Sequence, residues 1–172
     1  YNSTRQMELY PIVPEEYIPF VSKWFQAYGK EIGTEDIQKV YRLFEGNTYC
    51  MQRTFHEAFV NTSPDEVCTS DIIQKSINDI IEDNSHAYSR ILSQIPTRQK
   101  ELLYAIAKEG KADKITSGAF IKRHALLSAS SVQAAMKKLL ELDLVTVENA
   151  SFAIPDHFLK KYGMQLVRVA LE

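Results

Sequence analysis

Apolar residues recur at three- and four-residue spacing through the first half of the chain, which is the period of a helix that buries one face. Glycines, prolines and polar stretches divide this pattern into segments of helical length. They predict helices at residues 15–28, 35–45 and 48–60, and a longer one that begins at 63, 69 or 70 and ends at 95. A polar stretch at residues 82–86 can bend or break the last helix. The pattern therefore predicts a unit of residues 1–95, in which an extended lead-in at residues 1–14 is followed by a helical bundle.

The spacing of apolar residues changes after Pro96. Helical periodicity predicts helices at residues 97–109, 117–124 and 130–142, joined by short turns. The period then falls to two around Val145 and Val147, which predicts a short β-hairpin, and a last helical segment follows at 157–162. Helix, short helix, longer helix and hairpin are the elements of a winged helix-turn-helix. The predicted fold class is mainly α: a helical bundle at residues 1–95, then a winged helix-turn-helix with a short β-hairpin at residues 96–172.

The composition is that of an ordinary globular protein. Of the 172 residues, 45% are hydrophobic and 24% are charged, and no apolar run approaches the ~20 residues that span a bilayer. We therefore expect no membrane partner. Only Cys50 and Cys68 carry thiols, which favours a reducing compartment and a cytoplasmic location. The chain begins at Tyr1 without methionine or signal-like segment, so we expect a fragment of a longer protein.

Motifs of catalysis are missing from the sequence. It contains no phosphate-binding glycine loop, no H-E-x-x-H and no G-x-S-x-G, and its four histidines lack the spacing of a zinc site. Pairs of acidic residues fall mostly at predicted helix starts, where negative charge favours the helix dipole. We therefore expect no catalytic residues, no metal and no cofactor in this fragment, and no enzyme activity from it.

The net charge of −2 hides a division between the two halves. Residues 1–96 carry 8 Lys and Arg against 14 Asp and Glu, whereas residues 97–172 carry 12 against 8. Such a division indicates two units with different partners, and the mildly basic second unit favours nucleic acid.

The predicted helix at residues 130–142 has two faces of different chemistry. One face is apolar and the other offers small residues, an amide and lysines, which are the groups that approach, read and neutralise DNA. The preceding short helix ends in basic residues, near the position where a helix-turn-helix crosses the DNA backbone. The predicted nucleic-acid-binding residues are Lys122, Arg123, Ser130, Ser131, Gln133, Lys137 and Lys138.

Two observations leave the partner of this helix open. Ser130 and Gln133 have the spacing of a capping box, which gives both residues a structural role instead. The predicted tip of the wing at residues 148–151 carries no Lys or Arg, and Glu148 would meet phosphate unfavourably. Duplex DNA and a protein surface therefore both remain possible partners.

Nearly the whole chain resembles the C-terminal part of archaeal-type P-loop ATPases, the AAA+/STAND-like group. MELYPI (7–12) is similar to their linker, while YIPFVSKWF (17–25) and IQKVYRLFEGNTY (37–49) are similar to two helices of their lid. PTRQKELLYAIA (96–107) and SSVQAAMKKL (130–139) are similar to their terminal winged helix. The resemblance implies a parent chain with an N-terminal nucleotide-binding domain that uses ATP and Mg²⁺, and a winged helix that binds DNA or packs on the ATPase core.

The resemblance also implies that the lid closes over bound nucleotide. Asn47 and Arg53 are the candidate nucleotide-sensing residues. Thr48 stands where the family frequently has proline, however, and Arg53 lies well into its helix, where a solvated helix charge is the alternative interpretation.

A third hypothesis is a stand-alone winged-helix transcription regulator, with an apolar ligand pocket among Tyr17, Trp24, Tyr41 and Phe55.

Overall fold

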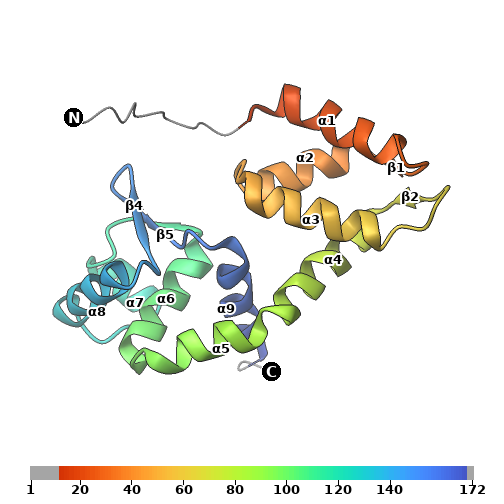
Figure 1. The fold of residues 1–172 in the computed structure, drawn as a ribbon. Helices are drawn as coiled ribbons and strands as arrows, with labels where there is room; N and C mark the ends of the chain where they lie inside the picture. The colour runs from red at the N-terminus through yellow and green to blue at the C-terminus, as the bar shows by residue number, and fades with distance from the viewer. Residues whose placement is uncertain (1–11, 170–172) are drawn as a thin grey trace, which may run out of the picture. The chain divides into compact units, whose positions relative to one another are not determined.

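The computed structural model describes residues 12–169. The chain forms two compact units that divide between Ile80 and Ile81, and each unit has its own core (Figure 1). An extended lead-in was predicted for residues 1–14; residues 1–11 lie outside the described residues, and α1 begins at Pro14.

Helices dominate the first unit. Its elements are α1 (Pro14–Gln26), β1 (Glu31–Ile32), α2 (Thr34–Leu43), α3 (Thr48–Val60), β2 (Val67–Cys68) and most of α4 (Ser70–Asp83). The apolar stripes of the helices pack on one another because each buries residues at helical spacing: Tyr17, Val21 and Phe25 on α1, Ile37 and Val40 on α2, and Met51, Phe55 and Ala58 on α3.

Aromatic rings fix the contact between α1 and α3. The Trp24 ring stacks on the Phe59 ring with centroids 4.7 Å apart, and the Phe25 ring meets Phe59 edge-on at 5.4 Å. Lys30 also contacts Phe59: its Nζ lies 3.9 Å from the Phe59 ring centroid and donates a hydrogen bond of 2.6 Å to the Phe59 carbonyl.

A parallel pair of two-residue strands joins two loops of the first unit. Glu31 pairs with Val67 and Ile32 pairs with Cys68. Strands this short carry no periodicity, and the sequence pattern did not predict them. The structure also decides where the fourth helix begins: α4 starts at Ser70, and the Ser-x-x-Glu segment at 63–66 is a turn that leads into β2.

The second unit contains a helix-turn-helix and a small sheet. Its elements are α5 (Ser85–Gln94), α6 (Thr97–Glu109), β3 (Lys111–Ala112), α7 (Gly118–Arg123), α8 (Ala129–Glu141), β4 (Thr146–Glu148), β5 (Ser151–Ala153) and α9 (His157–Val169). The sheet has the order β3-β5-β4 and both pairings are antiparallel. The hairpin of β4 and β5 is the wing.

Helix α6 is the centre of the second core, because it packs against both α8 and α9. Leu102 and Ile106 of α6 and Leu139 of α8 are fully buried. Helix α5 joins the same core through α9, where the Tyr88 and Tyr162 rings lie 5.5 Å apart. The packing therefore divides the chain inside α4, whereas the sequence pattern placed the domain boundary at Pro96.

The predicted fold class is confirmed: a helical bundle is followed by a winged helix-turn-helix with a short hairpin. The long helical run breaks at Asn84, between α4 and α5, inside the polar stretch that predicted a break. Two predictions were incomplete. Strand β3 was not foreseen, and the last helix extends to Val169 rather than ending at residue 162.

Candidate nucleic-acid interface

Helix α8 separates its polar and apolar residues as its periodicity predicted. Val132, Ala135, Met136 and Leu139 are buried in the second core. The opposite face is open to solvent along the whole helix. Its exposed residues are Ser130, Gln133, Ala134, Lys137, Lys138 and Glu141, with Ser131 half-buried beside them.

The cap of α8 lies earlier in the chain than predicted. Ser128 Oγ accepts a hydrogen bond of 3.2 Å from the Ser131 amide, so Ser128 is the N-cap. The expected capping box of Ser130 and Gln133 is therefore wrong, because Ser130 already lies inside the helix. Ser130 Oγ only shares a hydrogen bond of 3.1 Å with Ser128 Oγ, and the Gln133 side chain bonds to no other described residue. The fold leaves the Gln133 amide free for a partner.

Cations on this side of the domain fall into two groups. Lys138 pairs with Glu141 at 2.6 Å, and Arg123 pairs with Glu109 at 2.9 Å. Lys122 and Lys137 are exposed and have no ion-pair partner among the described residues. Exposed ion pairs are worth about 1 kcal/mol or less, so phosphate can recruit Lys138 and Arg123 as well.

Glu109 holds the end of α7 in place. Its Oε1 accepts from Arg123 Nη1 at 2.9 Å and lies 2.8 Å from His124 Nε2, and these two hydrogen bonds lower the pKa of the Glu109 carboxyl. The Phe120 and His124 rings are 4.5 Å apart beneath it. The turn between α7 and α8 is thus anchored to the end of α6.

A groove of about 690 Å³ runs between α8 and the wing. Apolar side chains form much of its wall, and two cations and one carboxylate stand among them. Its lining includes Lys114, Gln133, Met136, Lys137, Leu140, Glu141 and Phe152. The row of Gln133, Lys137 and Glu141 therefore faces the wing, whereas Ser130, Ala134 and Lys138 form the neighbouring row of α8.

The tip of the wing is a two-residue turn. Asn149 and Ala150 connect β4 to β5 with φ of 50° and 65°, a left-handed conformation that strains Ala150 more than it would strain glycine. Nothing in the tip supplies a cation, and the side chain of Glu148 lies outside the described residues. The wing therefore adds shape to the site but no positive charge.

The two candidate nucleotide-sensing residues belong to the N-terminal half of α3: Asn47 is its N-cap and Arg53 lies inside the helix. Asn47 Oδ1 accepts a hydrogen bond of 3.0 Å from the Cys50 amide and so caps the helix. Arg53 is half-buried further along the same helix. The capping bond explains Asn47 without nucleotide, and a nucleotide-sensing role for either residue stays a prediction.

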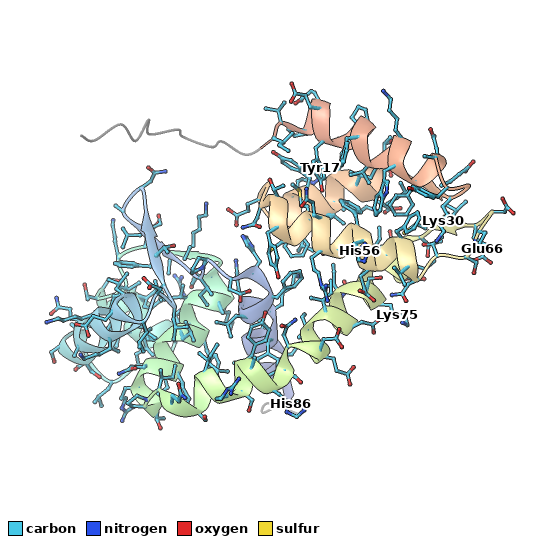
Figure 2. The ribbon with its side chains drawn as sticks, viewed as in Figure 1. Tyr17, Lys30, His56, Glu66, Lys75 and His86 are labelled. Atoms are coloured by element: carbon cyan, nitrogen blue, oxygen red, sulfur yellow. The ribbon has the colours of Figure 1, made fainter. Side chains whose placement is uncertain are left out.

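An aromatic cleft of about 240 Å³ lies between α1 and α3, where Tyr17 and His56 are labelled in Figure 2. Tyr17, Trp24 and Phe55 line it, as the hypothesis of a ligand pocket requires. Tyr41 does not line the cleft: its ring lies 6.4 Å from the Tyr17 ring and its hydroxyl donates to the Ile12 carbonyl. Burial raises the pKa of Tyr17 to about 12, as expected of a core phenol.

The described residues offer neither a metal site nor a membrane span. Among residues 12–169, no three His, Cys, Asp or Glu side chains are grouped so that they could hold a metal ion. No helix within that range is both long enough and apolar enough to cross a membrane.

Comparisons with known proteins agree with the second unit. Residues 86–165 match the sequence model of a family described as a probable winged helix domain. Neither the curated proteins nor the solved structures contain a match to this chain. None of these comparisons indicates a P-loop ATPase parent. The match begins in α5 and ends in α9, and it covers the helix-turn-helix and the β3-β5-β4 sheet, so this part of the chain is a winged helix domain.

Proposed function

We propose that the winged helix binds duplex DNA, with the exposed face of α8 in the major groove, and that the chain is the non-catalytic C-terminal part of a P-loop ATPase. One observation carries the DNA-binding proposal: the fold uses Ser128 as the cap of α8, and among the described residues the Gln133 amide has no hydrogen bond and the Lys137 ammonium forms no ion pair. Exposed groups that the fold does not use are available to a ligand.

The arrangement of these groups suits a helix lying in a groove. Small residues, Ala129 and Ser130, occupy the start of α8, where a recognition helix comes closest to the bases. Lysines 137 and 138 follow near the other end, where they can reach phosphates. Lys122 and Arg123 close the preceding helix and extend the basic surface along the DNA backbone.

Titration of a fluorescently labelled duplex at low salt tests this proposal. We expect the protein to bind the duplex. The logarithm of the association constant should fall linearly with the logarithm of the salt concentration, because contacts with phosphates release counterions. Lys137→Ala combined with Lys138→Ala should weaken binding by about 1–3 kcal/mol and lower the salt slope by about two.

Lys75→Ala is the matched control, because it removes an exposed lysine from α4 (Figure 2) that pairs with Asp79 at 2.7 Å. Its affinity for DNA should equal that of the unchanged protein. Absence of binding at low salt would end the DNA proposal.

A second candidate function is packing of the winged helix on another protein surface, in first place the ATPase core of the parent chain. The groove between α8 and the wing favours it, because Met136, Leu140 and Phe152 offer apolar surface there and the tip of the wing has no cation. Hydrogen exchange distinguishes the two candidates. Amides around Lys137 and Phe152 should be more strongly protected in the longer chain than in residues 1–172 alone; equal protection in both would contradict it.

The ATPase parent rests on the sequence resemblance of the helical unit and the winged helix. The coding region upstream of Tyr1 tests it directly. A G-x-x-x-x-G-K-[ST] segment there would support the parent and its use of ATP and Mg²⁺. A coding region without that segment would favour a stand-alone regulator, for which the aromatic cleft between α1 and α3 is the ligand site to examine.

A further inference from the structure

We infer that α8 selects A·T base pairs in the major groove, with Gln133 and Ala134 as the residues that contact the bases. This inference rests on the proposed binding of duplex DNA. It adds a sequence preference that the electrostatic contacts with phosphates do not supply, because phosphates are the same at every base pair.

Gln133 is placed to meet a base edge. It is exposed in the second turn of α8, one turn after the capped end, and its amide has no hydrogen bond with another described residue. A glutamine amide offers one donor and one acceptor side by side, which is the complement of N7 and N6 of adenine in the major groove. Residues Ser130 and Lys137 stand one turn before and after it on the exposed face.

Ala134 provides the apolar half of the same contact. It is exposed next to Gln133, and its single methyl group lets the helix backbone approach the groove closely. The thymine C5-methyl group is the only apolar feature of the major-groove edge, and alanine is one of the side chains that contact it. The Gln133 amide can therefore contact adenine while the neighbouring Ala134 methyl group contacts the methyl group of thymine.

The exposed groups of α8 that could contact G·C, Lys137, Lys138 and Glu141, lie one turn or more beyond Gln133, toward the C-terminal end of the helix. Arginine and lysine both form bidentate contacts with guanine; α8 has no arginine, and its two lysines are the residues assigned above to phosphates. Glu141, which could accept from cytosine, lies two turns beyond Gln133 and forms an exposed ion pair with Lys138 at 2.6 Å. Lys137 lies in the same row as Gln133, one turn further along α8, where its flexible ammonium can serve as a point charge for phosphate.

The test compares duplexes of one length that differ only in base pairs, measured with the whole chain at one salt concentration. Alternating dA·dT duplex should bind at least about fivefold more tightly than dG·dC duplex. Replacing thymine by uracil removes only the methyl group, and replacing adenine by 7-deazaadenine removes only N7. Each replacement should lower affinity.

A dI·dC duplex separates the two grooves, because it has the minor groove of A·T and the major-groove donors and acceptors of G·C. It should bind as weakly as dG·dC. Binding as tight as that of dA·dT would place the readout in the minor groove and overturn the inference.

Gln133→Ala should remove most of the preference, lowering affinity for dA·dT about five- to a hundredfold while leaving dG·dC binding nearly unchanged. Lys75→Ala should change neither affinity. Equal affinity of the unchanged protein for dA·dT and dG·dC would refute the base preference and leave DNA binding intact, whereas no binding to any duplex would refute the proposed function itself.

Discussion

The two faces of α8 differ in what constrains them. Leu139 on the inner face is fully buried, and its neighbours on α6 leave it no freedom of size or chemistry. Lys137 on the outer face is exposed and touches no described ion-pair partner. One helix therefore contains residues that stabilise the fold and residues that can contact a partner. Because substitutions on the inner face should lower stability and those on the outer face should not, measurements of unfolding can distinguish the two roles.

The largest effect is expected from the inner face. Leu139→Ala should lower the free energy of unfolding by about 2–5 kcal/mol, because it removes apolar contacts and leaves a cavity between α8 and α6. Urea unfolding followed by circular dichroism measures this change. A loss below about 1 kcal/mol would mean that the inner face is less tightly packed than its burial indicates.

The cap of α8 gives the next largest effect. Ser128→Ala should lower the free energy of unfolding by about 1 kcal/mol, because the Ser131 amide loses its acceptor. Ser130→Ala is the matched control and should change stability by less than about 0.5 kcal/mol, as exposed positions usually do. Thermal unfolding of both variants checks the pair. If Ser130→Ala lost more stability than Ser128→Ala, the result would support the capping box that the sequence predicted.

The same substitution should have opposite signs in the wing and in the helix. Ala150→Gly should stabilise the protein by up to about 1 kcal/mol, because glycine adopts the φ of 65° without strain. Ala134→Gly should destabilise it by about 0.5–1 kcal/mol, because glycine is a poor residue inside a helix. Differential scanning calorimetry can detect both shifts, and two shifts of equal sign would contradict this account of the turn.

The smallest effect is expected at Lys137. Lys137→Ala should change the free energy of unfolding by less than about 0.5 kcal/mol, since the side chain is exposed and unpaired among the described residues. Chemical unfolding of this variant measures its stability, and the DNA titration measures its affinity for DNA. A large loss of stability would show that the outer face also supports the fold, and weaker DNA binding by this variant could no longer be assigned to a lost contact.

Periodicity was enough to predict the helices and the hairpin. Apolar residues at helical spacing, such as Val132, Met136 and Leu139, locate α8 in the sequence and identify the face that it turns toward the core. The change to period two at Val145 and Val147 likewise locates the wing. These signals are strong because each element buries one face against the same core.

Features that depend on one residue or on distant pairs could not be predicted in the same way. Strand β3 has two residues and no period, and its partner lies on β5. The stretch around the start of α8 contains three serines, any of which is a good cap, so only the backbone identifies Ser128. Glu109 meets Arg123 and His124 from a different helix, and nothing in the local pattern connects them.

The pairing of β3 with β5 has a consequence for the order of folding. Ala112 and Phe152 are partners, although α7, α8 and β4 lie between them in the chain. The hairpin of β4 and β5 needs only a two-residue loop, whereas the β3 pairing closes a long one, which costs more entropy and slows its formation. We therefore expect β3 to pair with β5 after the intervening helices have come together. We expect the wing to form early as a hairpin and to become fixed on the domain in a late step.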